Sequence, residues 1–310
     1  MCAADPAYDP GPEVAGDRAA AAGVSRATEL RTPSGGSVVI GTAGWTHRTI
    51  LAPGVFYPDD ATTADARLRY YASRFPMVEV DASYYALPTA QNAELWARRT
   101  PEYFTFDVKA FALMTGHPTE VARFPKALRE ALPADVAAKR RVYPKDLPGD
   151  IYDSVWRTFV DALAPLRDAG KLGAVLLQYP PWLVPGGSSR DVIVEAKERL
   201  EGLRCAVELR NRLWFAPKTA ERTFAFLEEH GLPFVIVDEP QGLASSVPPM
   251  VAVTSPELAI IRMHGQRGDM WARPGASVED KYRYLYGRDQ LEEWVPKVEE
   301  AAERARRVHV

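Results

Sequence analysis

Hydrophobic and polar residues alternate in short segments spread along the chain from Val38 to Val310, and most of these segments end in a charged or hydrogen-bonding residue. In a β-strand, successive side chains point to opposite faces, so this alternation predicts strands with one apolar and one polar face. We expect eight strands, in the segments VVIGTAGW, MVEVDASYY, FTFDVKA, AVLLQYPP, CAVELR, PFVIVD, LAIIRMHG and RVHV.

Helical patterns connect most of these strands. Residues 289–305, for example, place Leu291, Trp294, Val295 and other apolar residues at helical spacing. Alternating strands and helices predict an α/β fold in which a parallel sheet closes into a TIM-like (β/α)8 barrel. The other expected helices cover residues 62–73, 89–100, 188–202 and 217–230.

Three segments depart from the regular alternation of strands and helices. Residues 111–173 form a long insertion after the third strand, which we interpret as either a lid over the barrel mouth or a packing extension. Residues 239–257 are rich in Pro and Ser and are expected to form an ordered loop. The last strand, RVHV, reaches the end of the sequence, so the eighth helix of the barrel is expected to be missing.

The composition indicates how the chain is divided into domains and which classes of partner it disfavours. Residues 1–36 hold few large apolar side chains and are expected to be a disordered or loosely attached leader, with a single barrel domain over 37–310. A net charge of −3 does not favour nucleic-acid binding, and the sequence contains no apolar run near the length of a membrane-spanning helix. Two cysteines provide no disulfide framework, so we expect a cytoplasmic protein.

The polar faces of the strands carry the candidate chemistry. If the apolar faces pack against the helices, the polar faces converge inside the barrel, and enzymes of this architecture place their chemistry at the carboxyl ends of the strands. The residues on these faces are Glu79, Asp81, Thr105, Asp107, Lys109, Glu208, Arg210, Arg262 and His264.

Six motifs, in this order, resemble the YecE-like family of barrel proteins (DUF72), whose activity is not established. They are IGTAGWTH followed by FYP, VEVDASYYALPT, FTFDVKA followed by TGHP, LLQYPP, VELRNRLWF, and IRMHG followed by YRYLY. The resemblance covers residues 38–310 and implies a TIM-like barrel with a polar pocket at the strand ends. By motif, the implied pocket residues are Trp45, Glu79, Tyr84, Lys109, His117, Gln178, Glu208, Arg210, Asp238, Arg262 and His264.

The sequence departs from the family pattern at two points. His47 stands where an aromatic residue is common, and the Asn-rich turn and closing helix that follow the last strand in the family are not present. The first departure affects the loop after the first strand, and the second leaves any site role of that turn unassigned.

The residue types support a first hypothesis, that the protein is a hydrolase or lyase acting on a small anionic or sugar-containing substrate. Acid and base roles fall on Glu79, Glu208, Asp238 and His264, because carboxyl and imidazole groups transfer protons when their surroundings tune their pKa values. Substrate binding falls on the other pocket residues: Arg210, Arg262 and Lys109 as an anion clamp, and Trp45, Tyr84, His117 and Gln178 as further contacts. The opposing interpretation is a structural network in which the carboxylates neutralise the cations.

Two further hypotheses remain open at this stage. Metal-assisted processing of nucleic acid is weakly supported, since His117, His264, Glu79 and other residues are suitable ligand types but none stands at chelating spacing, so no metal ligand is assigned. No dinucleotide fingerprint or P-loop is present, and no cofactor is assigned. The third hypothesis is a non-catalytic protein that binds an anion or another small ligand.

Overall fold

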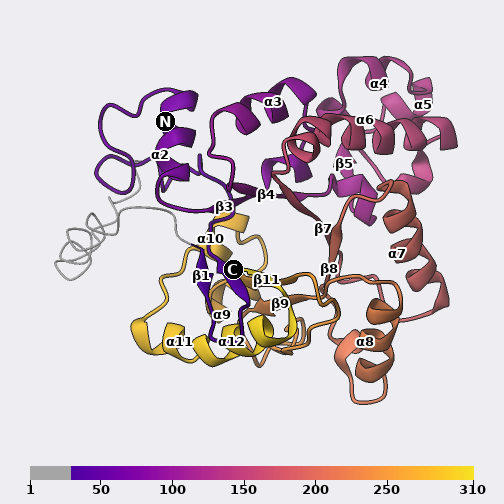
Figure 1. Ribbon diagram of the computed structural model, residues 1–310. Helices are drawn as coiled ribbons and strands as arrows, with labels where there is room; N and C mark the ends of the chain where they lie inside the picture. Colours follow the sequence, from indigo (N-terminus) through magenta and orange to yellow (C-terminus); the bar gives the residue numbers. More distant parts are fainter. Residues whose placement is uncertain (1–28) are drawn as a thin grey trace.

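The computed structural model describes residues 29–310, apart from the side chains of residues 278 and 279, and has a mixed α/β fold with two mainly parallel sheets (Figure 1). Each of the predicted strands coincides with an observed one. The first sheet has the order β1-β2-β11-β10-β9, with bounds Leu30–Arg31, Ser37–Val39, Arg307–His309, Ala259–Met263 and Val235–Asp238. The second has the order β3-β4-β7-β8, with bounds Met77–Val80, Thr105–Lys109, Leu172–Tyr179 and Cys205–Leu209.

The two sheets are linked by isolated parallel bridges. Ala43, just after β2, pairs with Glu79 of β3, and the amide of Glu79 donates to the carbonyl of Thr42 at 3.0 Å. Val207 of β8 pairs with Phe234, just before β9, and its amide donates to the carbonyl of Pro233 at 2.8 Å. These bridges make β2 a neighbour of β3 and β8 a neighbour of β9.

The predicted leader falls largely outside the described residues, because the structure describes nothing before residue 29. Its last part, residues 29–36, contains β1, which pairs antiparallel with β2 through the register Leu30↔Val38. These residues are therefore attached to the edge of the first sheet.

Helices surround the strands on the outside of the molecule (Figure 1). Two of them begin where the sequence provides a capping side chain: the hydroxyl of Thr63 accepts from the amide of Ala66, and that of Thr89 from the amide of Asn92. The helices that follow strands are α2 (Ala64–Ala72), α3 (Ala90–Arg98), α6 (Gly149–Asp168), α7 (Gly187–Arg199), α8 (Ala220–Glu229) and α12 (Val295–Arg304).

The single helix predicted over residues 289–305 is wrong. The chain forms α11 (Arg288–Glu292) and α12, because Pro296 lacks an amide hydrogen and is accommodated only in the first turn of a new helix. The predicted apolar stripe is correspondingly interrupted. Trp294 is buried, whereas Leu291 and Val295 are about half exposed, at 48% and 51%.

The insertion between β4 and β7 consists of short elements followed by the long helix α6. α6 packs against α3, and its Trp156, Phe159 and Leu163 lie in the core. The elements before it are η2 (Ala112–Thr115), β5 (Thr119–Glu120), η3 (Val121–Arg123), α4 (Lys126–Glu130), α5 (Ala134–Ala137), β6 (Arg141–Val142) and η4 (Pro144–Asp146). Figure 1 shows α4 and α5 at the periphery beside α6, and α4 contacts α6.

The remaining connection, residues 239–257, is a loop as predicted, without helix or strand. After β10 the chain forms α9 (Gly268–Trp271) and α10 (Val278–Tyr282) before α11. None of the helices in residues 29–310 combines the length and apolar character needed to cross a bilayer.

Gly41 provides a test of the junction between β2 and β3. A Cβ at this position would lie 2.8 Å from Cγ of Met77 and 2.9 Å from its backbone carbonyl carbon, so the strands would have to separate. We expect Gly41→Ala to lower the free energy of unfolding by about 1–3 kcal/mol, measured by urea denaturation. Gly149→Ala is the matched control, since nothing lies within 4 Å of its added Cβ. Equal stability of both variants would contradict the close approach of the two strands.

Candidate active site

Arg262, on β10, lies at the centre of a buried ion-pair network. Its Nε and Nη2 donate to Oε2 and Oε1 of Glu79 on β3, at 2.8 and 2.6 Å. Its Nη1 donates to Oε2 of Glu208 on β8 at 2.6 Å and to Oε1 of Gln178 on β7 at 3.3 Å. A single guanidinium therefore connects three strands of one sheet to the other sheet.

Arg210 forms the second half of the network, directly after β8. Its Nη1 donates to Oε1 of Glu208 at 3.0 Å and its Nη2 lies 2.9 Å from Oε2 of Glu239. Glu239 is fully buried, and its other oxygen accepts from the amide of Val247 at 2.6 Å, which ties the loop after β9 to the site. Glu208 thus binds both arginines and is itself closed to solvent.

His264 lies between the two guanidinium groups. Its Nδ1 is 2.8 Å from Nη1 of Arg210, and its Nε2 is 3.1 Å from Nη1 of Arg262. Burial, reinforced by the two arginines, lowers the pKa of His264 to about 4. The imidazole is therefore neutral near pH 7 and can accept a hydrogen bond from one of the two arginines.

The two central carboxyl groups differ in their pKa. Burial raises the pKa of Glu79, and the neighbouring Asp81 carboxylate adds to this effect, against the opposing influence of Arg262. Burial would also raise the pKa of Glu208, but Arg262 and Arg210 outweigh it and hold the pKa well below its usual range. Environments that separate two carboxyl pKa values in this way are typical of acid–base pairs.

Lys109, on β4, extends the site toward Asp81 and Tyr84. Its Nζ lies 2.9 Å from Oδ1 of Asp81, just after β3, and 4.7 Å from the ring centre of Tyr84. The Tyr84 ring contacts His117 edge to face, at 5.4 Å between ring centres. Burial and the nearby Lys109 lower the pKa of His117 to about 4, so this histidine is also neutral near pH 7.

Asp238, at the end of β9, lies beside the network without joining it. Its Oδ1 accepts from Nε2 of Gln266 at 2.7 Å and its Oδ2 from the hydroxyl of Tyr286 at 2.6 Å. The same Tyr286 oxygen accepts from the amide of Gly265 at 2.7 Å. Asp238 therefore anchors the segment that follows β10, and its acid or base role stays a prediction.

Trp45 is not brought to the network. Its ring packs edge to face against Trp96 of α3 and Phe106 of β4, at 5.7 and 6.4 Å between ring centres. Because Phe106 points away from the polar face of β4, Trp45 lies in the apolar layer between strands and helix. The substrate contact implied by the family motif stays a prediction for this ring.

Sequence reasoning missed three residues that border the network. Glu239 follows Asp238 directly, and only one of this adjacent pair was expected to face inward. Tyr282 and Tyr286 belong to the segment after β10, where no strand alternation indicates direction. The YRYLY motif was the one signal that could have found them.

The part of the chain that the structure describes contains no preassembled set of metal ligands. Within residues 29–310, no group of three or more His, Cys, Asp or Glu side chains is arranged to hold an ion. The carboxylates of the site are directed at arginine and lysine nitrogens.

The chain belongs to a protein family of unknown function. The family model described as "Protein of unknown function DUF72" matches residues 39–310, which confirms the resemblance seen in the motifs. The chain is 32% identical over 277 residues to the UPF0759 protein YunF of Bacillus subtilis (strain 168), covering 88% of this chain and 87% of YunF.

Two solved structures share the fold. A DUF72 family protein from Enterococcus faecalis V583 superposes with a TM-score of 0.69 and 23% identity, covering 88% of this chain and 87% of that one. One from Thermotoga maritima MSB8 gives a TM-score of 0.66 and 25% identity, covering 88% and 90%. The described arrangement of strands and helices is therefore that of the family.

Arg262→Met tests the energetic role of the network. The substitution leaves two buried carboxylates without their shared guanidinium, and removal of one partner of a buried ion pair costs about 3–5 kcal/mol. We expect a loss of this size in the free energy of unfolding, measured by urea denaturation. Adding Glu79→Gln and Glu208→Gln removes the uncompensated charges, so the triple variant should recover part of the loss. A triple variant less stable than Arg262→Met would contradict this interpretation.

The lowered pKa of His264 predicts an acid-sensitive fold. The unfolded chain binds a proton on this imidazole near pH 6.5, whereas the folded protein binds it near pH 4, so stability is present above pH 6.5 and is lost as the pH falls toward 4. We expect His264 to account for about 3 kcal/mol of that loss. Urea denaturation at several pH values should show a shallower pH dependence in His264→Gln than in the unmodified protein. Parallel curves would show that His264 titrates normally in the fold.

Proposed function

We propose that the protein is a hydrolase or lyase in which Glu79 is the acid–base group. The raised pKa of this carboxyl, set against the lowered pKa of Glu208 on the same guanidinium, is the observation that carries the proposal. Glu79 is slightly open to solvent, whereas Glu208 is closed. Glu79 is thus the member of the pair that a substrate can reach, and Glu208 is a positioning residue for Arg262 and Arg210.

The proposal includes a (β/α)8 barrel as the scaffold. Pairing within the sheets, together with the bridges at Ala43–Glu79 and Val207–Phe234, gives each parallel strand two parallel neighbours in the order β2-β3-β4-β7-β8-β9-β10-β11 and back to β2. Nδ1 of His309 on β11 also lies 2.7 Å from Oδ2 of Asp107 on β4, although these strands are not neighbours. Such contacts are expected inside a cylinder, where the polar faces meet.

The charges of the site favour a sugar-containing substrate over a simple anion. Lys109 is paired with Asp81, and the two arginines are paired with Glu79, Glu208 and Glu239. These cations already have carboxylate partners, so an anionic group would have to displace one of them. Hydroxyl groups can instead hydrogen-bond to such pairs without breaking them.

Two alternative functions would require different features of the same site. Metal-assisted processing of nucleic acid needs a ligand set, and the carboxylates that would supply it are bound to cations. A non-catalytic ligand-binding protein would have the same pocket without turnover. The alternatives are separated by whether Glu79 is needed for a chemical step or for binding alone.

Glu79→Gln keeps the shape of the side chain but removes its proton-transferring carboxyl. We expect it to lower the rate of cleavage by about 10²–10⁴-fold, measured by nitrophenolate release from a panel of nitrophenyl glycosides, esters and phosphates. Glu94→Gln, on the exposed surface of α3, should leave the rate unchanged. Full activity of Glu79→Gln, or no turnover of any substrate by the unmodified protein, would contradict the proposal.

A further inference from the structure

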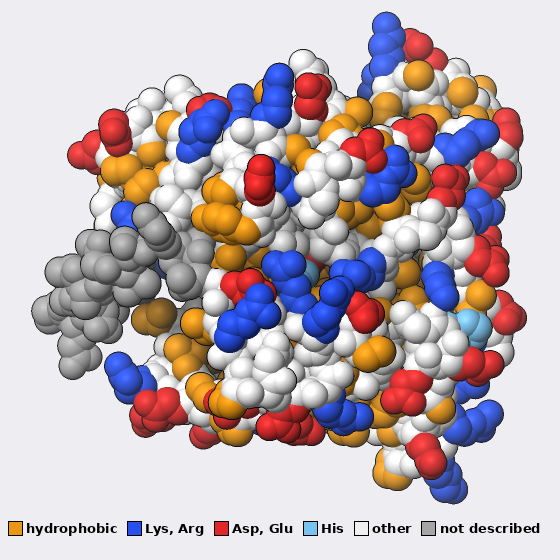
Figure 2. Space-filling model, viewed as in Figure 1, with side chains coloured by type: hydrophobic (Ala, Val, Ile, Leu, Met, Phe, Trp, Pro, Cys, Tyr) orange, Lys and Arg blue, Asp and Glu red, His pale blue; other side chains and the backbone are white. Residues whose placement is uncertain are grey.

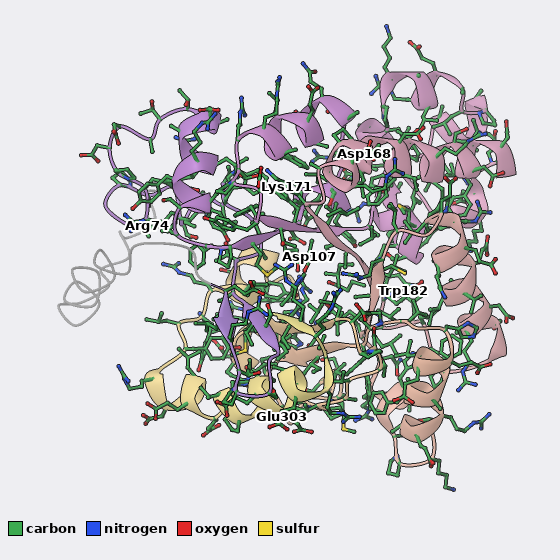
Figure 3. The ribbon with its side chains drawn as sticks, viewed as in Figure 1. Arg74, Asp107, Asp168, Lys171, Trp182 and Glu303 are labelled. Atoms are coloured by element: carbon green, nitrogen blue, oxygen red, sulfur yellow. The ribbon has the colours of Figure 1, made fainter. Side chains whose placement is uncertain are left out.

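Two groups of aromatic side chains border the charged network on different segments of the chain. The first contains Tyr84 and His117, and Trp182, which follows β7. The rings of His117 and Trp182 are in edge contact, at 5.5 Å between centres. Tyr84 covers Lys109, so this group, here called the first wall, begins at the charged residues and ends at Trp182. Trp182 is labelled in Figure 3.

The second wall comes from the segment after β10 and contains Trp271 and Tyr282. The Trp271 ring lies over the guanidinium of Arg210, at 5.4 Å, and is parallel to the His264 ring. Tyr282 contacts both Trp271 and His264 edge to face, each at 5.5 Å. Both walls border the same charged site, since Tyr84 lies over Lys109 and Trp271 lies over Arg210.

Both walls present aromatic surface to solvent. Trp182 is 58% exposed and Tyr282 41% exposed, and Tyr85, in edge contact with Tyr84, is 48% exposed. Figure 2 shows a recess near the centre of the molecule, with a histidine side chain inside it and Lys and Arg side chains at its border. Large aromatic side chains left exposed beside a recessed polar site are typical of ligand contacts.

We propose that the two walls form a binding subsite for a carbohydrate ring, a proposal that rests on the function proposed above and specifies its substrate. The apolar faces of a sugar ring pack on aromatic side chains, while its hydroxyl groups reach polar partners at the rim. Lys109 and Gln178 are polar partners of this kind, and each has some exposure to solvent. The sugar is recognised by its ring and hydroxyl groups, because the inner cations are already paired with carboxylates.

Binding without turnover tests this subsite. Purified Glu79→Gln protein, applied to an array of immobilised neutral and uronate-containing glycans, should bind at least one glycan, whose affinity is then measured by calorimetry. We expect Trp182→Ala and Tyr282→Ala, each introduced into Glu79→Gln, to weaken that binding at least tenfold. Tyr103→Ala is the control, because this tyrosine is equally exposed, at 53%, but precedes β4 at the opposite end of the strands.

The outcomes separate the subsite from the catalytic proposal. Glycan binding that depends on Trp182 and Tyr282 supports the subsite even if the unmodified protein turns over nothing, and the neutral and uronate arms show whether the sugar carries a charge. No binding to any glycan overturns the subsite, even if nitrophenyl esters or phosphates are cleaved. Preferential binding of single-stranded oligothymidylate, which also stacks on aromatic rings, overturns it as well.

Discussion

The shared ion pair of Arg262 is the interaction on which the organisation of the site depends. One guanidinium binds Glu79 and Glu208, which lie at different strands of one sheet, while Arg262 itself belongs to the other sheet. Removing Arg262 would leave Glu79 without its ion-pair partner and Glu208 with Arg210 alone, and an uncompensated buried charge is costly in a medium of low polarity. The network is therefore both a structural tie between the sheets and the source of the electrostatic field in the pocket.

That field gives the two glutamate carboxyl groups different pKa values and keeps the histidines neutral. Glu208 has two arginine partners and remains a carboxylate, whereas Glu79 shares one arginine and has Asp81 nearby, so it holds a proton more readily. His264 and His117 are neutral because burial and adjacent cations disfavour their charged forms. The site thus combines a carboxyl of raised pKa with neutral hydrogen-bonding groups.

Strand alternation predicted much of the fold and of the site. It placed Glu79, Glu208, Arg262 and His264 on converging faces, because period-two patterning fixes direction wherever the other face is buried. It was less informative where the chain leaves a strand, which is why Glu239 and the tyrosines after β10 were missed. Trp45 came from the family motif alone and packs against α3, and the helix predicted over residues 289–305 overlooked the effect of Pro296.

The long sequence separation of the central contacts has a kinetic consequence. Glu79 and Arg262 are 183 positions apart, and His309 meets Asp107 across 202. Bringing such distant segments together costs conformational entropy before their contacts can stabilise the fold. Proteins rich in such contacts therefore fold slowly. Glu79 and Glu208 are therefore joined through one guanidinium only once β10 has met the other sheet, because that guanidinium comes from β10.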